Sequence, residues 1–251
     1  MTQLVLYFAP DTCARVTMVA LEEIGQPYEV EVIEFMAGQH RSKEYLELNP
    51  SGKVPTLLVD LKPLSENPAI LTYLHRRFPD ADLLPAADND FAAAQVLSDL
   101  SYCASGLHPL VTRIRIPRFF CDIEDSAGRV VEMATSALRL NFEIIETRLR
   151  HNKWWYGEQW SILDAYINWV YFRVTGAGFD AADYPNFISH DERNRERPSV
   201  RRALEIGQHI YDDLESRGLA VKFDGPGAVN PAADAVARQN SGGAATIGKP
   251  E

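Results

Sequence analysis

The sequence predicts an α+β protein of two domains, a first that combines strands with helices and a second that is all-helical. Three observations lead to this fold class. Short apolar or alternating segments, which are typical of strands, occur within residues 1–80. From residue 90 onward, the long segments carry apolar residues at helical spacing. Between these regions, residues 81–89 have the proline- and aspartate-containing composition of a linker.

In the first domain we predict the element order β-α-β-α-β-β-α, which is the order of a thioredoxin-like domain. Strands are predicted at residues 4–8, 28–33, 56–59 and 63–64, and helices at 14–24, 43–48 and 68–78. Gly25 follows the first helix as a C-terminal stop. Pro68 opens the last helix, where a missing N–H costs nothing, and Pro79 ends it.

The second domain, residues 90–222, is predicted to contain four long helices, at 91–110, 129–150, 162–174 and 199–217. Ser161 and Asp164 form a capping box before the third of them, which we expect to aid folding rather than catalysis. The four tryptophans are expected in the core (Trp154, Trp155, Trp160 and Trp169). Residues 223–251 are rich in Ala, Gly, Pro and Asn, and we expect a flexible tail there.

The composition and charge of the chain exclude several classes of function. The chain has 251 residues, 46% of them hydrophobic, and a net charge of −10, which disfavours a nucleic-acid partner. No apolar run approaches the roughly 18 residues that span a bilayer. The N-terminal segment lacks the features of a signal peptide. Three widely spaced cysteines argue against a disulfide framework. We therefore expect a cytoplasmic protein that binds neither membrane nor metal.

Four local motifs occur in order along the chain: LNPSGKVP at 48–55, ENPAIL at 66–71, GEQWSILDAY at 157–166 and RPSV at 197–200. Each is weak alone, but in this order and spacing they resemble the glutathione S-transferase superfamily over about residues 3–222. The segment LYFAPDTC at 6–13 resembles the bacterial Beta class in particular, whose members carry L-Y-Y-x-P-x-S/T-C with the cysteine facing the glutathione sulfur.

The resemblance to the Beta class is incomplete. A His-Lys pair of that class aligns with Ala104 and Ser105, and a basic residue of the loop before Lys43 aligns with Ala37. His40 or Arg41 can take the place of the second. The chain therefore resembles a Beta-related bacterial branch.

The resemblance implies glutathione as cosubstrate, no metal, and a homodimer. Glu66 suits the γ-glutamyl ammonium, and the helix start at Asn67, with its side chain as donor, suits the γ-glutamyl carboxylate. The alternative for Asn67 is a simple helix cap. A cis Val54–Pro55 bond would offer backbone groups to the cysteinyl part of glutathione, with Lys53 beside it; an ordinary trans bond is the alternative.

Cys13 follows a strand and opens a helix, whose N-terminus lowers a thiol pKa. Thr12 and Tyr7 are rival donors to the glutathione sulfur, although Tyr7 fits core packing better. The alternative for Cys13 is a small buried side chain. Neither position three residues away is a cysteine, so a C-x-x-C mechanism is excluded.

The helical domain is expected to supply a second-substrate pocket with Tyr102, His108 and Arg113, although the arginines can instead form a solvated face or a subunit contact. The predicted function is a glutathione transferase that directs a thiolate at a small hydrophobic electrophile. Two alternatives stay open: a glutathione-dependent thiol–disulfide oxidoreductase or thiol lyase that uses Cys13, and a non-catalytic glutathione-binding protein of the same fold.

Overall fold

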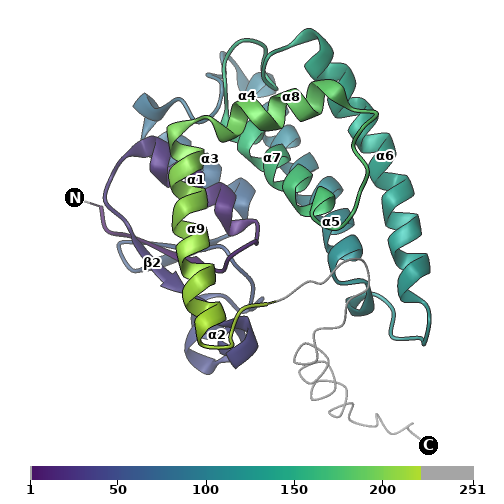
Figure 1. Cartoon of the computed structure of the whole chain (residues 1–251). Coiled ribbons are helices and arrows are strands. Elements are labelled where there is room, and N and C mark those ends of the chain that lie inside the picture. Colours follow the sequence, from purple (N-terminus) through teal and green to yellow (C-terminus); the bar gives the residue numbers. More distant parts are fainter. Residues whose placement is uncertain (1, 222–251) are drawn as a thin grey trace, which may run out of the picture.

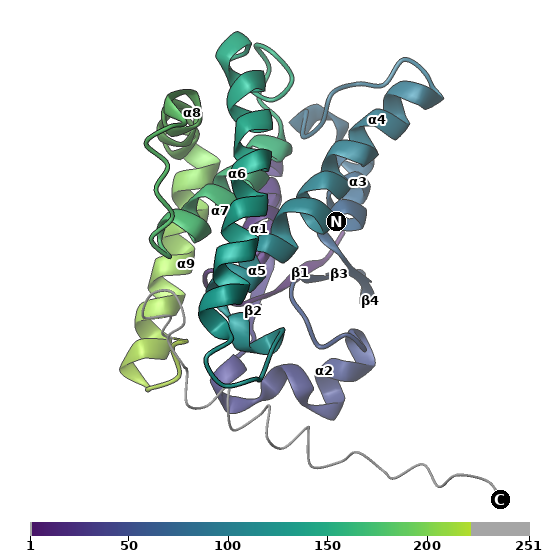
Figure 2. The same cartoon turned by 90° about the vertical axis from the view of Figure 1, so that its right-hand side faces the viewer.

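One mixed sheet of four strands forms the base of the N-terminal part of the molecule (Figures 1 and 2). The computed structural model describes residues 2–221, so the tail predicted at 223–251 lies outside the described residues. The strand order is β2-β1-β3-β4, with β1 parallel to β2, and β3 antiparallel to β1 and β4. The strands are β1 (Leu4–Phe8), β2 (Glu29–Val32), β3 (Thr56–Val59) and β4 (Lys62–Ser65).

Helices cover both faces of this sheet. Helices α1 (Ala14–Ile24) and α3 (Asn67–Arg77) lie on one face, and α2 (Lys43–Leu48) lies on the other (Figure 2). Successive side chains of a strand point to opposite faces of the sheet. The most deeply buried side chains of β1, Leu4, Leu6 and Phe8, therefore lie on one face. The predicted thioredoxin-like order is confirmed, and Gly25 ends α1 in the left-handed conformation, as expected.

The remainder of the described chain is helical (Figure 1). Its α-helices are α4 (Asp90–Ser101), α5 (His108–Arg115), α6 (Ala127–His151), α7 (Ile162–Thr175), α8 (Pro185–Arg195) and α9 (Pro198–Ser216). Short 3₁₀ turns lie between β2 and α2, at Phe35–Ala37 and Gln39–Arg41, and also at Pro79–Ala81 and Pro117–Phe119. Among residues 2–221, no helix is long and apolar enough to cross a membrane.

Two helical predictions need correction. The segment predicted to end at residue 110 continues to Arg115, because a π-helical stretch, η4 (Tyr102–Leu107), joins α4 to α5 and Pro109 falls within the first turn of α5. The His108 N–H donates to the carbonyl of Cys103, five residues back. Helix α8 was not predicted, because its buried face is largely polar and gives no apolar period; that face carries His190, Asp191 and Asn194.

Helix α1 connects the two parts of the molecule. It packs against α7 and α9 of the helical part as well as against α3. Most residues of α7 are buried, which places this helix at the centre of the helical part. At the C-terminal end of α1, Glu23 pairs with Arg197 at 2.8 Å, and Glu22 pairs with Arg202 at 2.6 Å. At the N-terminal end of α1, the preceding loop contacts Asn67 of α3 and Trp169 of α7.

Candidate functional site

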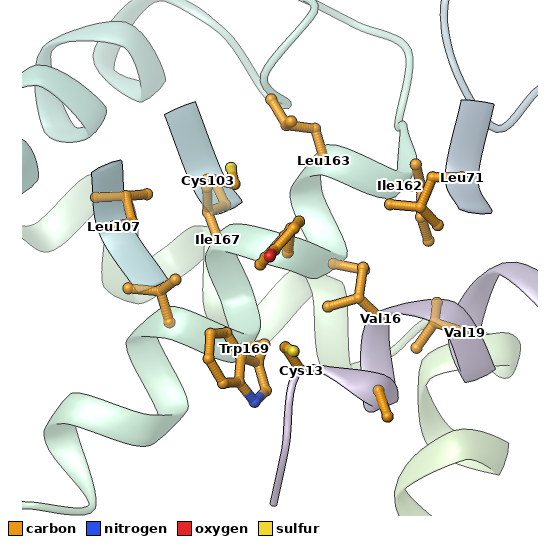
Figure 3. Close-up of a cluster of buried hydrophobic side chains, with 14 of the residues drawn as sticks. Cys13, Val16, Val19, Leu71, Cys103, Leu107, Ile162, Leu163, Ile167 and Trp169 are labelled. Carbon is orange, nitrogen blue, oxygen red and sulfur yellow. The ribbon is translucent and has the colours of Figure 1, made fainter. Parts of the chain in front are cut away.

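The loop between β1 and α1 carries the predicted sulfur-contacting residues. The Thr12 hydroxyl donates to the Ala9 carbonyl at 2.7 Å. Cys13 is the N-cap residue of α1, and its thiol donates to the Val54 carbonyl with a sulfur–oxygen distance of 3.7 Å. Figure 3 shows Cys13 beside the indole of Trp169 from α7. The thiol therefore lies where the two parts of the chain meet, and the hydroxyl of Thr12 is already engaged within its own loop.

Cys13 is protonated at neutral pH. Its burial, and next the charge of Glu66, raise the pKa of the thiol to about 12, while Lys53 and a hydrogen bond from Asn67 act in the opposite direction. The side chain is only 6% exposed. The prediction of a lowered pKa for Cys13 is wrong, because desolvation by burial outweighs the effect of the helix N-terminus.

The loop at 49–55 is fixed by three buried polar side chains. The amide of Asn49 donates to the Lys53 carbonyl at 2.8 Å and to Thr56 Oγ1 at 3.0 Å. The Tyr45 hydroxyl donates to the same Lys53 carbonyl at 2.6 Å. Lys53 itself is exposed. The Val54–Pro55 peptide bond that follows is cis, so the trans alternative does not hold.

Asn67 differs from its predicted role. Its amide donates to the Cys13 carbonyl at 3.0 Å, and its oxygen accepts from the Thr17 hydroxyl at 2.7 Å. Because the side chain is buried and uses both ends to join α3 to α1, it is neither a donor to a ligand nor a cap of α3. Its backbone N–H still lies in the first turn of α3.

Glu66 is the exposed residue that precedes α3, and its backbone is strained. Its backbone φ is +71°, in a region that residues other than glycine seldom adopt. Strained backbone tends to cluster at functional sites, where the surrounding structure holds it in place. The carboxylate is close enough to Cys13 to raise its pKa. The charges of Glu66 and Lys53 thus both act on the pKa of Cys13.

The loop that was predicted to supply a basic residue places two side chains differently. His40 packs against Phe35 with ring centroids 4.8 Å apart, and burial lowers its pKa, so it is a neutral packing group rather than a cation. The guanidinium of Arg41 lies over Gly52, at 3.0 Å from the position that a Cβ there would take. Arg41 is therefore the better candidate for the missing cation.

His108 faces the N-terminal part of the chain from the start of α5. Its ring meets the edge of Trp169, with centroids 4.7 Å apart. Burial, and then the charges of Lys53 and Arg173, lower its pKa to about 4. A neutral imidazole therefore lies across from Lys53. Trp169 in turn contacts the loop between β1 and α1, since its indole N–H donates to the Asp11 carbonyl at 3.2 Å.

Three other predicted site residues point elsewhere. The Tyr102 hydroxyl donates to Asn141 Oδ1 on α6 at 2.9 Å. Arg113 donates to the Pro109 carbonyl at 3.1 Å and stacks over Phe120. The structure gives Tyr102, His108 and Arg113 different neighbours, and their grouping in one second-substrate pocket stays a prediction.

Tyr7 is the third. Its ring packs on Tyr45, with centroids 5.4 Å apart, and burial, followed by the charge of Glu31, raises its pKa. A phenol in this position is a core group, so we withdraw it as a donor to sulfur.

Sequence reasoning missed the contribution of α7. Tyr166 is 1% exposed and lies close enough to Asn67 for a hydrogen bond that lowers its pKa, although burial raises that pKa overall. Trp169 and Arg173 contact Asp11 from the same helix face. All three have helical spacing, which core packing explains equally well, so no signal in the sequence separated them from ordinary core residues.

Comparison with known proteins agrees with this architecture. Residues 2–76 match the family model "Glutathione S-transferase, N-terminal domain". Glutathione S-transferase 3 of Zea mays is 30% identical over 173 residues, which are 66% of this chain and 75% of that protein.

Two solved structures are also similar. A bacterial Beta-class glutathione S-transferase from Sphingomonas chungbukensis is 28% identical, with a TM-score of 0.70 over 81% of this chain and 98% of that one. A glutathione transferase homologue from Sulfitobacter, solved with bound glutathione, is 27% identical, with a TM-score of 0.71 over 87% of this chain and all of that one.

Fold, motif order and these likenesses together define a thioredoxin-like domain joined to a helical domain of the transferase type. The chain belongs to the glutathione S-transferase superfamily and is a bacterial, Beta-like glutathione S-transferase.

Proposed function

We propose that residues 1–80 bind glutathione and that residues 90–222 hold a small hydrophobic electrophile against its sulfur. The observation that carries this proposal is the convergence of Cys13, Val54 and the Glu66–Asn67 helix start at the N-terminal end of α1. Glu66 is the partner for the γ-glutamyl ammonium, and the first turn of α3 offers backbone N–H groups to the γ-glutamyl carboxylate. Lys53 supplies positive charge near Cys13, and Arg41 supplies it beside Gly52.

Activation of glutathione requires a lower thiol pKa. Moving it from near 9 to between 6 and 7 needs about 3–4 kcal/mol, because each pKa unit equals about 1.36 kcal/mol. One helix N-terminus supplies up to about 2 kcal/mol. We propose that the protonated Cys13 thiol supplies the remaining hydrogen bond, turning from the Val54 carbonyl to the bound sulfur. A thiol whose pKa is about 12 suits this donor role, since it keeps its proton beside a thiolate.

The same pKa weighs against the covalent alternative. Disulfide exchange and lyase chemistry both need a thiolate at Cys13, and attack rates depend on the fraction of thiol that is ionised. Burial keeps that fraction small. Conjugation, in which Cys13 acts only as a hydrogen-bond donor, is therefore the function that we favour.

Glu66→Ala should weaken glutathione binding by about 1–3 kcal/mol, the range for a hydrogen bond to a charged group. The KM for glutathione should rise more than kcat falls, because this contact is made to the γ-glutamyl ammonium and not to the reacting sulfur. Titration calorimetry and steady-state kinetics measure both. Cys13→Ala, the matched variant at the sulfur of the ligand, should lower kcat more than it raises KM. A folded Glu66→Ala protein with unchanged affinity would mean that we have misplaced the site.

We also propose a homodimer, which the family resemblance implies. Helix α6 carries large exposed apolar side chains at Met133, Leu140 and Ile144, between 57% and 64% exposed, and Phe91 on α4 is 78% exposed. A second copy of the chain would cover these side chains across a two-fold axis.

Sedimentation at micromolar concentration should give twice the chain mass of 28.2 kDa. Ile144→Lys should shift the protein towards monomer, because a charge would be buried in the interface. Ile123→Lys is the control: Ile123 is also exposed, but it lies in the loop before α6, and its substitution should leave the dimer intact. A wild-type particle of one chain mass would refute the proposal.

A further inference from the structure

Asp11 has a backbone conformation that its sequence neighbours do not explain. It lies in the loop between β1 and α1, and its φ is +63°, in the left-handed region. Residues with a Cβ seldom adopt this region, although Asp tolerates it better than most. The strained residue is two positions before Cys13. Its conformation therefore sets the direction in which the chain enters α1 and presents Thr12 and Cys13.

Two contacts from α7 hold this conformation. Arg173 Nη1 lies 3.0 Å from Asp11 Oδ2, and the indole N–H of Trp169 donates to the Asp11 carbonyl at 3.2 Å. Trp169 and Arg173 are four residues apart, so both project from the same helix face. They are 2% and 6% exposed, whereas the Asp11 side chain is 38% exposed. Helix α7 of the second domain, which is well packed, thus holds the partly exposed loop before α1 in the first domain.

The loop is held from two further directions just beyond Asp11. The Cys13 carbonyl accepts from Asn67 of α3, and the Cys13 thiol donates to Val54 before β3. Of the three attachments, only the one through Asp11 comes from the helical domain. Figure 3 shows the result, with Cys13 and Trp169 adjacent where the two domains meet. Through Asp11 the helical domain thus contacts this loop directly, in addition to the packing of α1 against α7 and α9.

We propose that Asp11 is a positioning residue: its contacts with Arg173 and Trp169 fix the loop so that Cys13 and the N-terminus of α1 meet the glutathione sulfur. This role rests on the proposed function and assigns it a residue that does not touch glutathione. Asp11 acts through the loop, so its loss should affect the sulfur and leave the binding of the peptide part of glutathione intact. Small displacements of reacting groups can cost up to about a hundredfold in rate.

Three measurements on the full-length chain test this role. They are kcat with a small aryl halide, the ultraviolet absorbance of the thiolate of bound glutathione, and the affinity for S-methylglutathione, which has the peptide part but no thiol. Asp11→Ala should lower kcat by about 10- to 100-fold and reduce the thiolate absorbance, with the affinity for S-methylglutathione nearly unchanged.

Asp11→Gly separates the contact from the conformation, because glycine adopts a φ of +63° without strain but cannot pair with Arg173. It should be as defective as Asp11→Ala; wild-type kcat in Asp11→Gly would overturn the role of the side chain. Trp169→Phe removes the indole donor, together with part of the ring that packs against His108, and should shift the same two readouts in the same direction. It keeps the role testable if an Asp11 variant fails to fold.

Glu23→Gln is the matched control, since it breaks the pair with Arg197 at the other end of α1. It should leave kcat and the thiolate absorbance unchanged. Equal losses in Glu23→Gln and Asp11→Ala would show a general effect of domain packing and overturn a specific role for Asp11. A wild-type protein that binds neither glutathione nor S-methylglutathione would overturn the proposed function itself, whereas an active wild type with a fully active Asp11→Ala would overturn only this role.

Discussion

Asp164→Ala is expected to lower the free energy of unfolding by about 3–5 kcal/mol, the range for removing one partner from a buried charged network. The Asp164 carboxylate is fully buried and accepts four hydrogen bonds. They come from the Ser161 N–H and hydroxyl, the Trp155 N–H and the His190 ring. Its removal would leave these groups without an acceptor at the start of α7 and beside α8. Denaturant unfolding monitored by tryptophan fluorescence measures the loss.

Asp183→Ala is the control for this effect. Asp183 is exposed in the loop before α8, and exposed substitutions change stability by about 0.5 kcal/mol or less. If Asp164→Ala destabilised the protein no more than Asp183→Ala, the network around α7 would not have the importance that its burial indicates. Because α7 also carries Trp169 and Arg173, loss of activity in Asp164→Ala should accompany loss of structure.

His108 is expected to make the protein less stable in acid. Its pKa is about 4 in the folded protein against an ordinary value of 6.5, mainly because the ring is buried. Below pH 6.5 the unfolded chain binds a proton at this position that the folded chain does not bind. The stabilising contribution is thus complete above pH 6.5 and falls as the pH drops towards 4, by up to about 3 kcal/mol.

His108→Asn should therefore flatten the dependence of unfolding free energy on pH between 6.5 and 4, whatever it costs in packing against Trp169. Urea unfolding at several pH values measures the slope. Some slope should remain, because burial also lowers the pKa values of His40 and His75. His151→Asn, on the exposed last turn of α6, should retain the wild-type slope. An unchanged slope in His108→Asn would contradict the assignment.

Local signals were sufficient to predict most of the fold. Strand β1, helix α2 and the capping box at Ser161 depend on patterns within a few residues, and the structure confirms each of them. Helix α8 escaped prediction because its inward face is polar, and such a face is explained only by partners distant in sequence, such as Asp164 beside His190.

The candidate site was less predictable than the fold. The motifs at 48–55 and 66–71 predicted a ligand site. They did not reveal which of its side chains already form hydrogen bonds within the protein. Asn67 is the clearest case, because its two partners, Thr17 and the Cys13 carbonyl, lie 50 and 54 residues away in sequence. The pKa of Cys13 was mispredicted for a similar reason: a helix terminus is visible in sequence, whereas burial depends on the whole tertiary structure.

The π-helical stretch between α4 and α5 has a consequence for how the length of this segment can change. Each residue of an α-helix rotates the next side chain by about 100°, and a π turn accommodates one more residue per turn than an α turn. Deleting a single residue within Tyr102–Leu107 could therefore convert the π turn into an α turn while the side chains of α4 and α5 keep their directions. The segment between α4 and α5 can therefore change in length by one residue while both helices keep their places in the fold.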